Sequence, residues 1–170
     1  MFWNRNSHIN EIQVQRSEKE LKGHYLVEAL KKSLAFIEFT PDGNIVDANA
    51  NFLAAVGYSR DEVIGKHHKI FCDPTYTHSQ EYKRFWQELG QGQFKKERYK
   101  RFTKSGDVLW LEASYNPIID DENKVLSVVK FATDITKSVE TESKNKGIIE
   151  SINRSMAIIS FETDGTVIEA

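Results

Sequence analysis

A repeat within the chain constrains its fold more than any other feature of the sequence. Residues 33–48 and residues 155–170 align with Ser, Ala, Phe, Asp, Gly and Ala recurring in register, and apolar positions match apolar positions. Each copy holds an apolar segment, an Asp-Gly turn and a second apolar segment, which is the pattern of a β-hairpin. The spacing between the copies is too long for a solenoid repeat. The sequence therefore predicts tandem domains, with the second cut off after its first two strands.

The chain after the first copy predicts a mixed domain. Residues 36–40 are predicted to form a strand that turns at Asp42-Gly43, where glycine takes positive φ without steric cost, and then returns. Short helices are predicted over residues 49–65, with a capping box at Ser59-Arg60-Asp61-Glu62. A longer helix is predicted over residues 80–89, where apolar residues recur at spacings of three and four.

Three further strands are predicted over residues 95–102, 108–117 and 125–133, with polar turns between them. The first of these contains a basic run with interleaved aromatic residues. That pattern occurs in nucleic-acid patches and in half-buried strands, and the strand is the simpler interpretation. The order of elements predicts an α+β domain whose helices lie on one face of an antiparallel sheet.

Helices are predicted on both sides of this domain, over residues 9–34 and 137–153. Both carry sparse apolar residues on a charged background. Such helices are rarely stable alone, so we expect parallel pairing in a homodimer rather than packing back on the domain. The predicted boundaries are 1–24 for an N-terminal helical segment, 25–137 for the first domain, 138–153 for a signalling helix, and 154–170 for the truncated second domain.

The composition excludes several classes of function. The 23 basic and 25 acidic residues nearly balance, so no field of one sign draws the chain to nucleic acid or anionic lipid. The sequence lacks a glycine-rich phosphate loop in a valid context, a metal-ligand spacing and a Ser/His/Asp set, so no enzymatic activity is expected. The single cysteine rules out an internal disulfide. Neither a membrane-spanning apolar run nor a signal peptide is evident, so we expect a cytoplasmic protein.

Several motifs resemble those of the PAS family. The stretch Asp47-Ala48-Asn49-Ala50-Asn51-Phe52 and the following Val56-Gly57-Tyr58 resemble the PAS asparagine and the Gly-Tyr pair before its short helices. Lys104-Ser105-Gly106-Asp107 with Trp110 resembles the final hairpin of the family. The resemblance implies a PAS fold, a five-stranded antiparallel sheet with short helices on one face and signalling helices at its ends, and a sensory rather than a catalytic role.

A closer resemblance is to PAS domains of soluble methyl-accepting chemotaxis receptors, including the biofilm-dispersal receptor type. It lies in residues 65–71, 82–86, 114–118 and 129–136. It implies a cytoplasmic signal transducer with a downstream chemotaxis signalling domain, a kinase and an adaptor as partners. A cofactor-free dimerisation and relay module of a histidine kinase or a cyclic-dinucleotide enzyme is the alternative.

The same region is similar to the flavin-binding PAS domain of aerotaxis receptors, in which residues at the positions of Asn49 and Trp86 belong to the FAD site. The resemblance implies a redox, oxygen, energy or small-ligand sensor. The candidate cofactor contacts are Asn49, His68, Phe71, Trp86, Trp110 and Asn116. Because Cys72-Asp73 stands where that family has an Arg-His pair, two alternatives to FAD stay open: haem, with His67, His68 or His78 as iron ligand, and a pocket without such a cofactor. No other metal site is expected.

Signal relay is assigned to Asp134-Ile135-Thr136, which resembles the junction between a PAS sheet and its output helix. The ligand state is expected to alter hydrogen bonding at a sheet face that carries Trp110, Ser114, Asn116, Lys130 and Thr133. A shift there would tilt the helix that begins at Lys137, and two such helices in a dimer would convert the tilt into a packing change.

Overall fold

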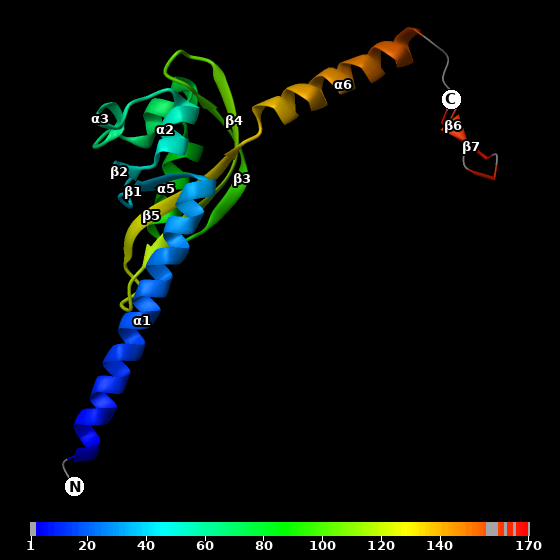
Figure 1. Ribbon diagram of the computed structural model, residues 1–170. Helices are drawn as coiled ribbons and strands as arrows, with labels where there is room; N and C mark the ends of the chain where they lie inside the picture. The colour runs from blue at the N-terminus through cyan, green and yellow to red at the C-terminus, as the bar shows by residue number, and fades with distance from the viewer. Residues whose placement is uncertain (1–2, 156–159, 162, 165, 170) are drawn as a thin grey trace. The chain divides into compact units, whose positions relative to one another are not determined.

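Five antiparallel strands form one sheet in the first of the two units of the chain, residues 1–134 (Figure 1). The computed structural model describes residues 3–155, 160–161, 163–164 and 166–169. The spatial order is β2-β1-β5-β4-β3, so the first strand pairs with the last. The strands are β1 Ala35–Phe39, β2 Ile45–Ala48, β3 Lys95–Phe102, β4 Val108–Ile119 and β5 Val125–Asp134. This arrangement confirms the predicted α+β fold.

The helices that follow β2 lie together on one face of the sheet (Figure 1). Their apolar side chains, including Phe52, Val63, Phe85 and Leu89, join those of the strands in a single core. The first unit also contains the long helix α1. The elements are α1 Trp3–Ser33, α2 Ala50–Val56, α3 Arg60–Val63, the 3-10 helix η1 His68–Phe71, α4 Pro74–Thr77 and α5 Gln80–Gly90. The capping box at Ser59 is confirmed, with Glu62 bonding back to the Ser59 amide.

The Asp-Gly turn between β1 and β2 requires glycine for two reasons. Gly43 has a φ of 94°, which L side chains rarely adopt. A Cβ atom at this position would also lie 2.7 Å from the indole of Trp86 on α5. The turn predicted from the sequence therefore also sets how closely α5 approaches the first hairpin.

The second unit, residues 135–170, contains helix α6 Thr136–Ser155 and a short antiparallel pair, β6 Ser160–Phe161 and β7 Val167–Glu169. The strand pair coincides with the second copy of the sequence repeat. Residues 156–159, 162, 165 and 170, which that copy includes, lie outside the described residues. The start of a second domain at residue 154 stays a prediction. In the described ranges, no helix is both long and apolar enough to cross a bilayer.

Candidate ligand site

Asn49 ties three elements of the first unit together. Its Oδ1 accepts hydrogen bonds from the amides of Phe36, at 3.0 Å, and Phe52, at 2.9 Å. Its Nδ2 donates to the carbonyls of Lys31, at 2.7 Å, and Leu34, at 2.8 Å. The side chain thus caps the start of α2 and satisfies a carbonyl in the last turn of α1. All four hydrogen-bonding positions of the amide are occupied, so Asn49 has none left for a cofactor.

His68 is the polar centre of the core. It is 1% exposed, and its Nδ1 and Nε2 each lie 3.0 Å from a tyrosine hydroxyl, of Tyr82 and Tyr115 respectively. Burial, with the positive charges of Arg101 and Lys130, holds the pKa of His68 well below its ordinary value. The ring is therefore neutral, and one nitrogen donates while the other accepts. The two tyrosines consequently take opposite hydrogen-bonding roles.

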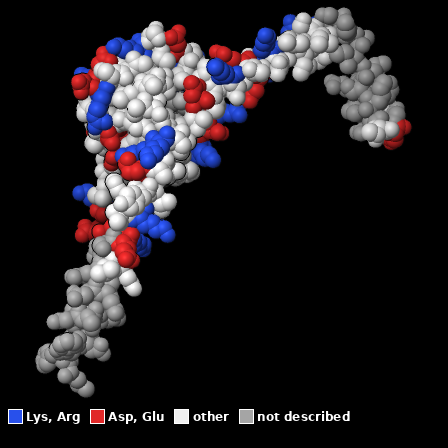
Figure 2. Space-filling model, in the orientation of Figure 1, with Lys and Arg blue, Asp and Glu red and all other residues white. Residues whose placement is uncertain are grey.

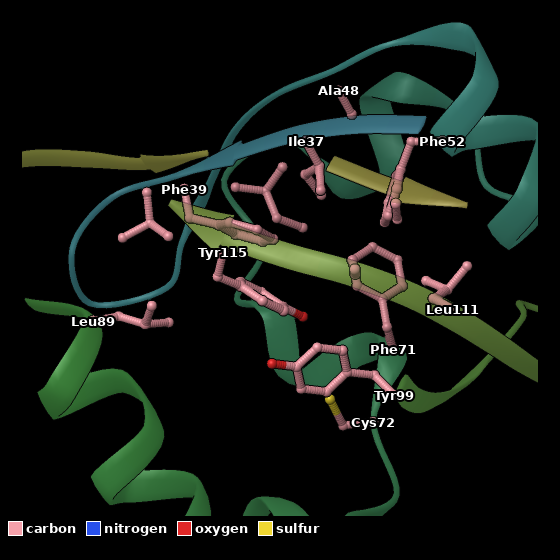
Figure 3. Packing of buried hydrophobic residues seen from close by; sticks show 14 of the residues in the cluster. Ile37, Phe39, Ala48, Phe52, Phe71, Cys72, Leu89, Tyr99, Leu111 and Tyr115 are labelled. Carbon is pink, nitrogen blue, oxygen red and sulfur yellow. The ribbon is translucent and has the colours of Figure 1, made fainter. Parts of the chain in front are cut away.

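Aromatic rings fill the space around His68. Its ring centroid lies 5.4 Å from those of Phe39 and Trp86 and 6.3 Å from that of Phe71. In Figure 3, Phe71, Tyr99, Tyr115 and the sulfur of Cys72 meet in the space between the sheet and the helices. Burial raises the pKa of the Cys72 thiol, so Cys72 contributes as a small apolar side chain. This part of the interior is packed with side chains.

Two basic side chains are buried beside this cluster. Arg101 is 4% exposed and Lys130 1% exposed. Arg101 donates from Nη2 to the hydroxyl of Tyr115, at 3.3 Å, and from Nη1 to the carbonyl of Lys100, at 2.7 Å. The Nζ of Lys130 lies over the Tyr115 ring, 4.8 Å from its centroid. Within residues 3–155, neither of these side chains forms an ion pair with a carboxylate.

Three polar atoms in this region are buried without a hydrogen-bond partner. They are the Nε of Arg101, the hydroxyl of Tyr99 and the Nε1 of Trp86. Burial and the nearby charge of Arg101 also hold the pKa of Lys130 well below its usual range. Buried polar groups in folded proteins are nearly always hydrogen-bonded, so an orphaned group needs an explanation.

A cleft of about 700 Å³ reaches Arg101 from the surface. It lies between α4 and α5 on one side and β3 on the other. Its aromatic walls are Tyr76, Phe85, Tyr99 and Phe102, and its remaining lining is mostly charged. Of the two buried basic residues, Arg101 lines the cleft and Lys130 does not.

The predicted cofactor contacts divide between the two faces of the sheet. His68, Phe71 and Trp86 come together in the core. Trp110 and Asn116 do not join them, because side chains alternate along β4 and its inward positions are Leu109, Leu111, Ala113 and Tyr115. Lys130 points to the core as well, so the predicted sheet face that united it with Trp110 and Asn116 is wrong. The amide of Asn116 instead donates to the carbonyl of Val129, at 3.1 Å.

Haem does not fit the three candidate histidines. Both ring nitrogens of His68 are hydrogen-bonded to tyrosines. His67 is also engaged through both nitrogens, with the Asp42 carbonyl at 2.9 Å and the Lys69 amide at 3.1 Å. His78 is exposed and bonds the Pro74 carbonyl through Nδ1. FAD does not fit the predicted set either, since its members face opposite sides of the sheet and Asn49 is fully bonded. The described residues also contain no group of three His, Cys, Asp or Glu placed to hold a metal ion.

The predicted relay residues join the two units. Asp134 is the last residue of β5 and pairs with Leu111 of β4, and Thr136 is the first residue of α6. Their role in signalling stays a prediction.

Sequence reasoning missed the polar core. Tyr82, Tyr99, Arg101 and Tyr115 were not candidates, and Lys130 was grouped with Trp110 and Asn116, which lie on the other face of the sheet. A signal for the two basic residues was present: Arg101 follows Tyr99 at the two-residue spacing of one strand face, and Lys130 stands between Val128 and Ala132 at the same spacing.

We expect acid to destabilise the chain through His68. The unfolded chain binds a proton near pH 6.5, whereas the folded chain keeps this ring neutral to a much lower pH. The unfolded state therefore binds more protons below about pH 6.5, and the free energy of unfolding falls as pH falls, by up to about 1.4 kcal/mol per pH unit. Urea unfolding at about pH 7.5, 6.5 and 5.5 measures this slope. His68→Gln should reduce this slope and leave the part that His67 contributes, since burial lowers the pKa of His67 too. The exposed control His24→Gln should keep the whole slope. An unchanged slope in His68→Gln would contradict the assignment.

Comparisons of the sequence and of the structure with known proteins both point to the PAS domain. Residues 33–137 match the family profile described as PAS domain. The biofilm dispersion protein BdlA of Pseudomonas aeruginosa is 48% identical over 142 residues, which are 84% of this chain and 34% of that protein. The chain thus spans about a third of the length of that relative.

Two solved structures share the fold. One is the PAS domain of a protein from Colwellia psychrerythraea, with 22% identity, a TM-score of 0.58, and coverage of 67% of this chain and 97% of that one. The other is a light-oxygen-voltage domain studied with a flavin analogue, with 21% identity, a TM-score of 0.56, and coverage of 72% and 96%. At these identities the likeness concerns the fold alone.

Proposed function

The chain belongs to the PAS domain family, and from this premise we propose that it is the sensory module of a cytoplasmic chemotaxis-type transducer. It senses a small ligand or a redox state and relays that state through α6. It has no enzymatic activity of its own. The observation that carries this proposal is the position of Lys130, which belongs to the buried polar cluster and lies four residues before the end of β5.

The path from the cluster to α6 is short. β5 ends at Asp134, and α6 begins at Thr136. A change in charge or hydrogen bonding around Lys130 would shift β5, and β5 continues directly through Asp134-Ile135-Thr136. A signalling device needs an element with two arrangements, and a helix paired in a dimer supplies one.

A homodimer is the proposed assembly. Helix α1 exposes large apolar side chains, namely Leu21, Tyr25, Leu26 and Leu30. Helices with such a sparse stripe need a partner to be stable. Charges of both signs are interspersed over the visible face of the first unit (Figure 2), which favours protein partners over nucleic acid. The proposed partners are a second copy, a downstream signalling domain, and its kinase and adaptor.

A second candidate function is a cofactor-free dimerisation and relay module. The packed interior around His68 and the exposed apolar side chains of α1 favour it. An absorbance spectrum of the purified chain separates it from the flavin and haem hypotheses. We expect neither a flavin band near about 450 nm nor a Soret band near about 400 nm. Stoichiometric flavin in the purified protein would overturn this expectation.

Replacement of Asp134 tests the relay. We expect Asp134→Ala in the parent transducer to reduce its stimulus-dependent output about tenfold, the size of a typical coupling free energy. The urea midpoint of the 170-residue chain should change little, because the side chain is exposed at the end of β5. Glu122→Ala, in the exposed turn before β5, is the matched control and should signal normally. Normal output from Asp134→Ala would count against the relay.

A further inference from the structure

The cleft beside β3 reaches a buried arginine, Arg101, whose positive charge is not paired with a carboxylate of the described residues. Arg101 lines this cleft, is 4% exposed, and forms no ion pair within the described residues. A buried cation without an anion is costly, and proteins rarely retain one without a function. The charge of arginine persists at any physiological pH. The charge at the end of the cleft therefore favours an anionic ligand.

Arg101 and Tyr99 also retain hydrogen-bonding capacity for such a partner. The Nε of Arg101 and the hydroxyl of Tyr99 are buried and have no hydrogen-bond partner. Both residues line the cleft, and because the two atoms are closed to solvent, a ligand reaches them only after a small shift of the side chains around them. Nε and Nη2 lie on one edge of the planar guanidinium, and this edge binds the two oxygens of a carboxylate in parallel. The opposite nitrogen, Nη1, is held by the carbonyl of Lys100, at 2.7 Å, which fixes the plane of the group.

The walls of the cleft indicate the body of the ligand. Tyr76, Phe85, Tyr99 and Phe102 line it, and rings of this kind pack well against a flat apolar group. The charged lining limits the charge of the ligand. Acidic and basic residues alternate there, and Lys95 is already paired with Glu88. The lining holds five basic and four acidic residues, so its net charge of +1 suits a monoanion such as a carboxylate better than a polyanion such as a pyrophosphate.

We propose that this cleft is a binding site for a small organic carboxylate with a flat apolar body, held by Arg101 and Tyr99. Lys130 stands behind the site, and the positive charge of Arg101 acts on it. Binding of an anion would reduce that repulsion and favour protonation of Lys130 on β5. The site would thus give the proposed sensory module its input. The biological role of this site rests on the proposed sensory function. Its existence does not, because ligand binding to the purified chain is measured without any signalling output.

Isothermal titration calorimetry of the 170-residue chain with benzoate tests the site. Benzamide serves as the neutral probe of the same shape, and inorganic phosphate as the compact anion. We expect benzoate to bind and benzamide not to bind. Arg101→Gln should weaken benzoate binding about ten- to hundredfold, the usual effect of losing a hydrogen bond to a charged group. Arg84→Gln, which removes an exposed cation from the lining of the same cleft, should change it less than about threefold.

A milder variant guards against misfolding of Arg101→Gln. Tyr99→Phe keeps the ring and removes only the orphaned hydroxyl, and it should weaken benzoate binding about two- to tenfold. Circular dichroism checks that each variant is folded. Three results with the wild-type chain would overturn the proposal: no benzoate binding, equal binding of benzamide, or binding of phosphate in place of benzoate. Unchanged benzoate affinity in both folded variants would do the same.

Discussion

Replacing Asn49 by alanine is expected to lower the free energy of unfolding by about 3 kcal/mol, because four hydrogen bonds worth about 0.5–1.5 kcal/mol each are lost together. Their partners, the amides of Phe36 and Phe52 and the carbonyls of Lys31 and Leu34, are partly buried and would be left without this side chain. The loss includes the cap of α2, which alone is worth about 1 kcal/mol. Urea unfolding measures the effect.

Two further variants separate the contributions. Asn49→Asp keeps the acceptor for the two amides but cannot donate to the two carbonyls, so it should lie between the wild type and Asn49→Ala. Asn51→Ala is the matched control, since this exposed amide makes longer bonds, of 3.1–3.4 Å, to the same end of α1. It should cost less than about 1 kcal/mol. If Asn49→Ala were as stable as Asn51→Ala, the structural role given to Asn49 would be wrong.

Asn49 illustrates what can be predicted from one sequence. The motif around it was correctly associated with the PAS fold. Its assignment as a cofactor contact came from family resemblance and not from its own surroundings. Two of its four partners, Lys31 and Leu34, lie 18 and 15 residues earlier in the chain. A local sequence pattern cannot predict hydrogen bonds between residues so far apart in the chain, because these bonds depend on how the end of α1 packs against α2.

The elements themselves were easier to predict than the direction of each side chain. All five strands of the first unit and helix α5 were expected at nearly their observed positions, because alternation and helical spacing are local signals. For β4, the position of the strand was predicted, but the sequence does not show which of its faces is buried. Its outward face carries Trp110 and its inward face Leu111, so both faces offer a large apolar residue. A choice between them requires knowing which face the helices cover. The prediction placed Trp110 and Asn116 beside the ligand, and the helices cover the other face.

Replacing the buried Lys130 by an apolar residue is expected to increase stability. Lys130→Met should raise the free energy of unfolding by about 2 kcal/mol near neutral pH, because burial disfavours the charged form of this amine in the folded chain only. Methionine fills a similar volume with an unbranched apolar chain. The pKa of Lys130 in the folded chain lies well below its usual range. Below about pH 10.4 the unfolded chain therefore binds the extra proton, and this favours unfolding.

The pH dependence of the stability difference between Lys130→Met and the wild type tests this explanation. The stability gained in Lys130→Met should shrink as pH rises toward about 10.4, where the unfolded lysine also loses its proton. Lys124→Met, at an exposed position just before β5, should change stability by less than about 0.5 kcal/mol at any pH. A Lys130→Met variant that is less stable than the wild type would show that contacts with aromatic rings hold the lysine in place. A variant that is more stable but no longer signals would identify Lys130 as a residue retained for function at the expense of stability, as is common at functional sites.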